Sequence, residues 1–161
     1  MRTIRVLIVD DMPEVRQELR TVLTLASVGG GGEAEDGIAT IEDETSHDPI
    51  PDGNYPADEE PSFEIQFIGE AGNGLEAIRE AERLLPDVVL MDLEMPVLDG
   101  YEATRRIKSA FPDCRVIALT VHGYDDARRK ALQAGIDDFI VKGAPVETLV
   151  EAILSKPAKA F

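Results

Sequence analysis

The stretch VVLMDLEMP, residues 88–96, places four consecutive apolar side chains directly before Asp92. Continuous apolarity without polar alternation is typical of a strand that is covered on both faces, as in a parallel sheet. Three further runs rich in branched side chains share this pattern, at residues 6–9, 116–119 and 139–141. A fifth run, residues 65–68, alternates more and is expected nearer an edge of the sheet.

Segments with helical spacing lie between these five runs. Residues 15–23 place apolar side chains at i, i+4, i+7 and i+8, and Pro13 precedes them at a position suited to a first helical turn. Four more helices are expected at residues 77–85, 101–110, 125–134 and 146–154. The alternation predicts an α/β domain with a doubly wound, five-stranded parallel sheet and right-handed crossovers.

One segment, residues 28–62, departs from this compact pattern. It holds eleven carboxylates, no Lys or Arg, four successive glycines and almost no apolar periodicity. Connections in α/β units normally take about 2–6 residues, so we interpret this stretch as a long insertion between the first helix and the second strand. Its composition favours disorder or a loosely held excursion. A functional loop is the alternative, and residues 38–44 could form a short helical turn.

The 161-residue chain carries 32 acidic and 16 basic residues, for a formal net charge of -16, and the part outside the insertion has a net charge of -5. This acidity argues against binding of nucleic acid or anionic lipid by this chain, because phosphates require basic partners. Cys114 is the only cysteine, so no internal disulfide or cysteine zinc motif is expected. No stretch approaches the roughly 18 apolar residues of a membrane span, and we expect a cytoplasmic protein.

Polar residues follow four of the apolar runs, where the carboxyl ends of parallel strands would gather at one edge. They are Asp10 with Asp11, Asp92, Thr120 and Lys142. Three carboxylates placed close together would raise at least one pKa unless a cation sat among them, and such oxygen ligands favour Mg²⁺. Asp92 could also act as a nucleophile that forms an aspartyl-phosphate. Lys142 and Mg²⁺ would then balance charge during in-line transfer, and Thr120 could bind one product oxygen.

Each of these residues has an ordinary structural explanation when it is taken alone. Asp92 would be the N-cap of a helix, Thr120 a turn residue and Lys142 a solvated charge. Their joint occurrence at the ends of four different strands favours the chemical interpretation instead.

These motifs resemble those of the receiver domain of two-component response regulators. The likeness rests on Val-Asp-Asp at 9–11, Met-Asp-Leu-Glu-Met-Pro at 91–96 with Asp-Gly at 99–100, Ala-Leu-Thr at 118–120 and Phe-Ile-Val-Lys-Gly at 139–143. It covers residues 1–27 and 63–155. Because Lys-Gly-Ala replaces the commoner Lys-Pro, the chain is most similar to receivers that precede a LuxR/NarL-type helix-turn-helix domain. The resemblance implies a flavodoxin-like fold with strand order 2-1-3-4-5.

The resemblance also implies roles for the acidic residues. Asp92 would accept a phosphoryl group from a histidine kinase or a phosphotransfer protein, so the chain would be a signalling phosphoacceptor and not an enzyme with substrate turnover. Asp11, Asp92 and the backbone carbonyl of Glu94 would bind Mg²⁺ directly. Asp10 would act on the metal through water.

Further roles concern the switch and the lifetime of the phosphorylated state. Thr120 and Phe139 match the switch pair of the family, in which Thr120 moves towards the phosphoryl group and the ring of Phe139 turns inward. The side chains of Glu94 and His122 would flank the path of a hydrolytic water and so set this lifetime. The alternative is that both are ordinary exposed polar residues.

We expect residues 1–155 to form the receiver domain, interrupted at 28–62, and residues 156–161 to be a tail or the start of a linker. The chain would act alone or precede a DNA-binding domain that regulates transcription, and homodimerisation stays open. One competing hypothesis is a constitutive interaction module, in which the insertion binds a basic partner or covers the basic residues 128–130. Another is an aspartate-nucleophile phosphatase with Glu94 as acid/base, which the lack of a cap domain disfavours.

Overall fold

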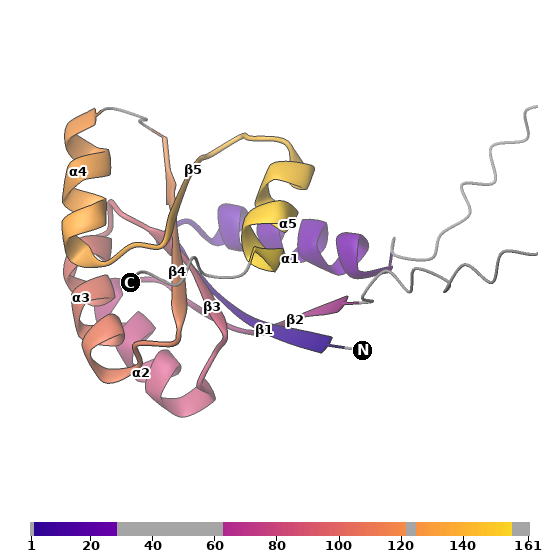
Figure 1. The fold of residues 1–161 in the computed structure, drawn as a ribbon, viewed down its shortest axis with the longest axis horizontal. Coiled ribbons are helices and arrows are strands. Elements are labelled where there is room, and N and C mark those ends of the chain that lie inside the picture. The colour runs from indigo at the N-terminus through magenta and orange to yellow at the C-terminus, as the bar shows by residue number, and fades with distance from the viewer. Residues whose placement is uncertain (1, 29–62, 122–124, 156–161) are drawn as a thin grey trace, which may run out of the picture.

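The computed structural model describes residues 2–28, 63–121 and 125–155 and has helices and strands in strict alternation (Figure 1). Their bounds are β1 (Arg2–Val9), α1 (Pro13–Val28), β2 (Phe63–Ala71), α2 (Gly74–Leu84), β3 (Val88–Asp92), α3 (Gly100–Ala110), β4 (Arg115–Thr120), α4 (Asp125–Ala134), β5 (Asp138–Val141) and α5 (Val146–Leu154). Every strand and helix expected from the sequence is present. No helix in the described ranges is long and apolar enough to cross a membrane.

The five strands form one parallel sheet in the order β2-β1-β3-β4-β5. This order confirms the flavodoxin-like topology and places β1 beside β3. The register pairs Val9 with both Ala71 and Met91, and it pairs Asp92 with Leu119. The carboxyl ends of neighbouring strands therefore lie at the same end of the sheet, immediately before the predicted site residues.

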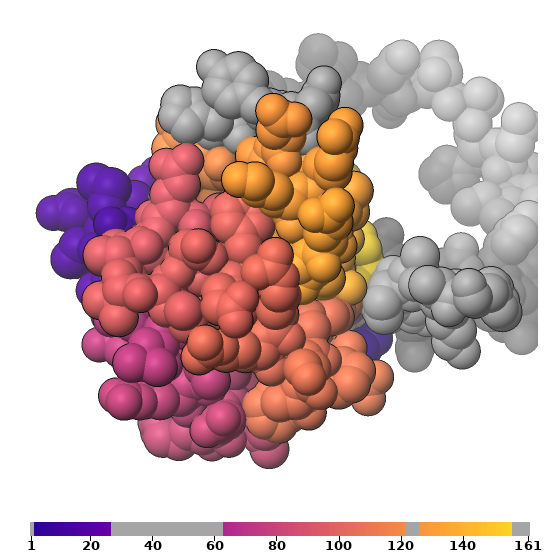
Figure 2. All heavy atoms as spheres, turned by 90° about the vertical axis from the view of Figure 1, so that its left-hand side faces the viewer, coloured from indigo at the N-terminus to yellow at the C-terminus, as the bar shows by residue number. Residues whose placement is uncertain are grey.

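Helices cover both faces of the sheet, with α1 and α5 on one face and α2, α3 and α4 on the other (Figure 1). Alternate residues of β4 belong to two separate cores: Val116 and Ala118 face α2–α4, whereas Ile117 and Leu119 face α1 and α5. Figure 2 looks onto the three-helix side, where α2, α3 and α4 form the surface. The buried helical residues on this side include Ala77, Ala81, Ala103 and Ala131, whose small side chains let the helices lie close to the sheet.

The two edge strands differ in how well the sequence predicted them. β2 lies at one edge, as its alternating pattern indicated. β5 forms the other edge. The expectation that residues 139–141 are covered on both faces holds for Phe139 and Ile140, which pack into the cores on opposite faces, but fails for Val141, which is 45% exposed. A run of three apolar residues is too short to distinguish an edge strand from a central one.

A tight contact joins the start of α3 to the end of β3. The side chain of Asp99 accepts a hydrogen bond from the amide of Glu102, so α3 begins at Gly100, one residue before the predicted start. A Cβ at Gly100 would overlap the carbonyl of Asp92. Glycine at this position therefore lets the helix approach the last residue of β3.

The predicted insertion and tail lie outside the described residues, apart from Val28, which is the last residue of α1. The structure does show where the insertion is attached. α1 begins at Pro13, beside the carboxyl end of β1, and its 16 residues run away from that end for about 24 Å. β2 begins at Phe63, which pairs with Arg2 at the amino end of β1. Both attachment points therefore lie away from the carboxyl ends of the strands, where the site residues lie.

Candidate functional site

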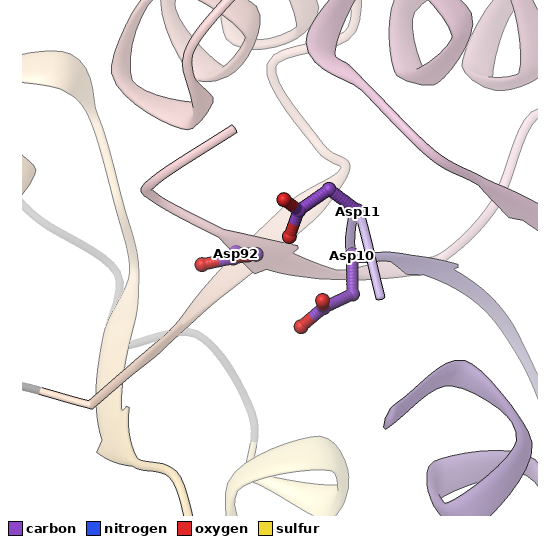
Figure 3. A group of neighbouring side chains, drawn as sticks. All are labelled: Asp10, Asp11 and Asp92. Atoms are coloured by element: carbon purple, nitrogen blue, oxygen red, sulfur yellow. The ribbon is translucent and has the colours of Figure 1, made fainter. Parts of the chain in front are cut away.

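Three carboxylates converge at the carboxyl ends of β1 and β3. Asp10 and Asp11 directly follow β1, and Asp92 is the last residue of β3. One oxygen of each carboxylate lies within 4.8 Å of the others (Figure 3). Asp10 is fully buried and Asp92 is 4% exposed, whereas Asp11 is exposed. Because the two strands are neighbours and parallel, residues far apart in the sequence form one acidic cluster, as predicted.

Three of the four polar groups of Asp10 make hydrogen bonds within the protein, and the fourth, Oδ2, forms only an ion pair. Its amide donates to the carbonyl of Ala71 at 3.1 Å, and its Oδ1 accepts from the amide of Met12 at 2.9 Å. Its carbonyl accepts a hydrogen bond from Nη1 of Arg16 at 2.6 Å. Its Oδ2 forms an ion pair with Nζ of Lys142 at 2.7 Å. The carboxylate of Asp10 is thus committed to contacts within the protein.

The ammonium of Lys142 connects the two buried carboxylates. Its Nζ lies 2.7 Å from Oδ2 of Asp10 and 3.4 Å from Oδ2 of Asp92. Lys142 follows β5, and its amide donates to the carbonyl of Thr120 at 2.7 Å, which places it beside the end of β4. Burial alone would lower the pKa of Lys142, but contact with Asp10 and the charge of Asp92 outweigh burial and raise this pKa. Lys142 is therefore a charged partner for both carboxylates.

Asp92 is less well compensated than Asp10. Burial and the negative charge of Asp10 raise the pKa of Asp92 to about 6, against the charge of Lys142 and a 3.2 Å hydrogen bond from the amide of Glu94. Crowding by Asp10 therefore contributes to the raised pKa of Asp92, as predicted, but burial contributes more. One ammonium does not neutralise three carboxylates, and this set of oxygen ligands fits a hard divalent cation such as Mg²⁺.

Thr120 and Phe139 lie on the same face of the sheet. Thr120 is the last residue of β4 and is 4% exposed. Ala118, two residues earlier and on the same face, pairs in register with Phe139 of β5. Phe139 is half-buried, and the guanidinium of Arg128 from α4 lies 5.8 Å from the centre of its ring. The three basic residues 128–130 of α4 are all exposed, as in an ordinary solvated helix face.

The predicted roles of Glu94 and His122 both stay predictions, for different reasons. Glu94 is exposed, and its backbone lies at the cluster because its amide donates to Asp92. The proposed metal contact of its carbonyl and the proposed effect of its side chain on hydrolysis stay predictions. His122 lies outside the described residues, so its predicted role also stays a prediction.

The sequence pattern does not mark three basic residues that join elements in the structure. Arg16 binds the carbonyl of Asp10, as described above. Arg115 of β4 donates to two carbonyls at the end of α5. Lys108 of α3 lies 2.9 Å from the carboxylate of Asp137 and 3.0 Å from the carbonyl of Cys114. Backbone carbonyls are among the partners in each case, and since every residue carries one, no sequence signal identifies which carbonyl is bound.

The family model described as the response regulator receiver domain matches residues 62–154, so this chain belongs to the receiver domain family. The match covers the segment from β2 to α5. It confirms the resemblance that the motifs of the sequence indicated.

Individual relatives support the same assignment. The response regulator GacA of Pseudomonas viridiflava is 43% identical over 89 residues, which is 55% of this chain and 42% of that protein. This chain therefore spans less than half the length of that relative. A LuxR-family two-component response regulator from Aurantimonas sp. SI85-9A1 has a crystal structure that matches with a TM-score of 0.65 and 26% identity, over 94% of this chain and 82% of that one. The signal receiver domain of NarL from Mycobacterium tuberculosis shares the fold, with a TM-score of 0.69 and 21% identity over 97% of this chain and all of that one.

Proposed function

We propose that this chain is a phosphoacceptor receiver domain, in which Asp92 takes a phosphoryl group from a histidine kinase or a phosphotransfer protein. The observation that supports this most directly is the 3.4 Å contact between Lys142 and Asp92 inside the cluster of three carboxylates. A carboxylate that attacks a phosphoryl group must approach another anion. Cations close to it are therefore a requirement of the reaction.

The proposed step transfers one phosphoryl group between two side chains. An oxygen of Asp92 attacks the phosphorus of a phosphohistidine in line with the P–N bond. The histidine nitrogen leaves with the electron pair of that bond and gains a proton, while Asp92 becomes an acyl phosphate. Asp92 must be ionised to attack, and with its pKa near 6 it is mostly ionised at pH 7 even without a metal. Lys142 lies close enough to bind an oxygen of the transferred group.

The acidic residues would hold the cation that this step requires. Asp11 and Asp92 are the direct ligands in this proposal, together with the carbonyl of Glu94, and Asp10 acts through water. Bound there, Mg²⁺ would offset the negative charge of the phosphoryl oxygens. The contacts of Asp10 with Met12 and Lys142 support this division, because they occupy both of its carboxylate oxygens.

Thr120 and Phe139 would convert the charge at Asp92 into a change of shape. In this proposal the hydroxyl of Thr120 binds a phosphoryl oxygen and the ring of Phe139 turns towards the space that Thr120 leaves. Their position on one sheet face supports the pairing, because Phe139 lies beside the small residue Ala118 on the neighbouring strand, two residues before Thr120. This movement would bias an element with two states, as in other switches driven by a local charge.

The wider role follows from the relatives and is also part of the proposal. The LuxR-family neighbour suggests an output through DNA, which another domain would bind, and the phosphoryl donor would be a kinase or phosphotransfer protein. We place this activity in the cytoplasm. The domain would transfer a phosphoryl group to its own aspartate and hydrolyse it slowly, without turnover of an external substrate.

The test uses beryllofluoride, which mimics a phosphoryl group on an aspartate. We expect Mg²⁺ with beryllofluoride to bind the wild-type chain, seen as a bound ¹⁹F signal and as shifted amide signals in NMR spectra. Incubation with acetyl phosphate should add the mass of one phosphoryl group. Asp92→Asn should abolish both results, because the amide is neither a nucleophile nor an anionic ligand.

The matched control is Asp113→Asn, the same change at an exposed residue in the turn between α3 and β4. This variant should respond like the wild type, since the turn leads into the amino end of β4, whereas Asp92 lies at the carboxyl end of β3. The proposal fails if the wild type shows neither beryllofluoride binding nor phosphorylation, or if Asp92→Asn retains both.

A further inference from the structure

Arg16 lies in the first turn of α1 and contacts the backbone of the carboxylate cluster. Its Nη1 donates to the carbonyl of Asp10 at 2.6 Å. Its Nε lies 3.6 Å from Oε1 of Glu70, a residue of β2, and its side chain is 17% exposed. The guanidinium therefore joins α1 to the ends of β1 and β2 at one point. The roles given above to the site residues do not involve this contact.

The contact acts on the peptide group that connects two residues of the cluster. Because a peptide group is planar, the direction of the Asp10 carbonyl also sets the direction of the Asp11 amide. The amide of Met12 holds the side chain of Asp10 through its Oδ1 at 2.9 Å. Together, these two hydrogen bonds define how the exposed Asp11 is placed relative to the buried Asp10.

We propose that Arg16 is a positioning residue of the cation site, which acts by holding the peptide group between Asp10 and Asp11. This inference rests on the proposed function, since it requires that Asp11 and Asp92 bind one divalent cation. Asp11 is exposed, so its backbone has to be held in place for its carboxylate to meet that of Asp92 at a single ion. Groups that orient metal ligands in this way contribute measurably to metal affinity.

Charge and position predict opposite effects when Arg16 is removed. The guanidinium is always positive, so its field opposes a second cation nearby, and its loss would tighten Mg²⁺ binding if charge were the main effect. Glu70 adds to this contrast, because without Arg16 its carboxylate would be an extra negative charge near the cluster. Loss of positioning would instead weaken Mg²⁺ binding. The sign of the change therefore identifies the role.

The experiment is a Mg²⁺ titration of the whole chain, followed by amide chemical shifts in ¹H–¹⁵N NMR spectra, for the wild type, Arg16→Gln and Arg16→Lys. We expect Arg16→Gln to weaken Mg²⁺ binding about 10-fold. Arg16→Lys keeps the charge but loses the planar fork that contacts Asp10 and Glu70 together, so we expect a weakening of about 3-fold. Melting temperatures in EDTA report separately on the stability of each variant.

The matched control is Arg20→Gln, which removes the same charge one turn further along α1. Arg20 lies over the ring of Phe67 at 5.6 Å from its centre, and within the part of the chain that the structure describes it makes no hydrogen bond or ion pair with the three carboxylates of the cluster. Its Mg²⁺ affinity should stay within about 2-fold of the wild type, since only a distant, exposed charge is lost.

The outcomes separate this inference from the proposed function. If the wild type binds Mg²⁺ and Arg16→Gln binds it equally or more tightly, the positioning role is overturned while the proposed function stands. If the wild type does not bind Mg²⁺, both are overturned. If Arg16→Gln does not fold, Arg16→Lys decides, and an affinity equal to that of the wild type then overturns the inference.

Discussion

Asp92 is buried and lies near the negative charge of Asp10. Both effects raise its pKa, from an ordinary value of 3.8 to about 6. Between these two pH values the folded state keeps a proton that the unfolded state has lost. The contribution of Asp92 to stability without metal therefore falls as the pH rises from about 4 to about 6, by about 2–3 kcal/mol in total, and stays lower above pH 6. A cation that binds the carboxylate of Asp92 would offset this destabilisation.

We predict that Asp92→Asn removes this pH dependence. In EDTA at pH 7 the variant should be more stable than the wild type by about 1–3 kcal/mol, because a neutral amide replaces the crowded carboxylate. At pH 4, where the folded carboxyl is protonated, the two proteins should differ much less. Urea denaturation between pH 4 and pH 8 measures both curves. Parallel curves would show that Asp92 titrates normally, contrary to the prediction.

The backbone of Val97 is strained. It lies in the loop between β3 and α3 with a φ of 73°, and its side chain is 79% exposed. A β-branched residue in this region is unfavourable, and glycine is not. We expect Val97→Gly to stabilise the protein by about 0.5–1 kcal/mol in urea denaturation, after the entropy cost of glycine is subtracted.

The control for this change is Val146→Gly, at the first residue of α5. The backbone there is helical, so glycine should destabilise the protein by about 1 kcal/mol. Destabilisation by Val97→Gly of the same size as in this control would mean that Val97 is not strained.

At the scale of elements, the end of α5 is held by a residue from the sheet. Arg115 of β4 is 8% exposed, and it donates to the carbonyl of Ile153 at 3.0 Å and to that of Ala152 at 2.8 Å. These carbonyls belong to the last turn of α5, where the carbonyl oxygens have no N–H donors within the helix. A cation at this end is also favoured by the helix dipole.

We predict that Arg115→Met destabilises the protein by about 2–4 kcal/mol, because two buried carbonyls lose charged donors. Hydrogen exchange should speed up in the last turn of α5 before it does so elsewhere. Arg83→Met is the control, because Arg83 is an exposed residue of α2 whose contact with Glu80 lies at the surface, and its loss should cost about 0.5 kcal/mol or less. Equal effects of both changes would contradict the capping role.

β5 shows why the positions of strands and helices in the sequence were easier to predict than their neighbours in the fold. The spacing of apolar residues depends on the local backbone, so it located all five strands and all five helices. Whether β5, which ends at Val141, is a central strand or an edge strand depends on whether another strand pairs with its far side. That choice is made by the order of the sheet, and a three-residue run carries no information about it.

At the scale of the whole molecule, the site and the attachment of the acidic insertion lie at different ends of the sheet. α1 ends at Val28 and β2 begins at Phe63, whereas the carboxylate cluster follows the carboxyl ends of β1 and β3. All eleven carboxylates of the insertion belong to residues 29–62, so removing them changes the net charge from -16 to -5. Charges in solvent that are more than a Debye length apart, about 8 Å at physiological salt, are mostly screened from one another.

We predict that replacing residues 29–62 with a Gly/Ser linker of about six residues preserves the response to Mg²⁺ and beryllofluoride. The affinity for Mg²⁺ should stay within about 2-fold at physiological salt, measured by the same NMR titration as for the wild type. A loss of 10-fold or more would place part of the insertion at the site, contrary to this expectation.

The positions of Asp10, Asp11, Asp92, Thr120 and Lys142 at one edge followed from the chain alone, because each comes at the end of a strand and parallel strands end together. The contacts among them did not follow. That Lys142 lies nearer Asp10 than Asp92, and that Arg16 holds the carbonyl of Asp10, depends on the packing of α1, β2 and β5 around β1. Periodicity determines which element a residue occupies, whereas distances of a few ångströms between side chains of different elements are set only when those elements pack together.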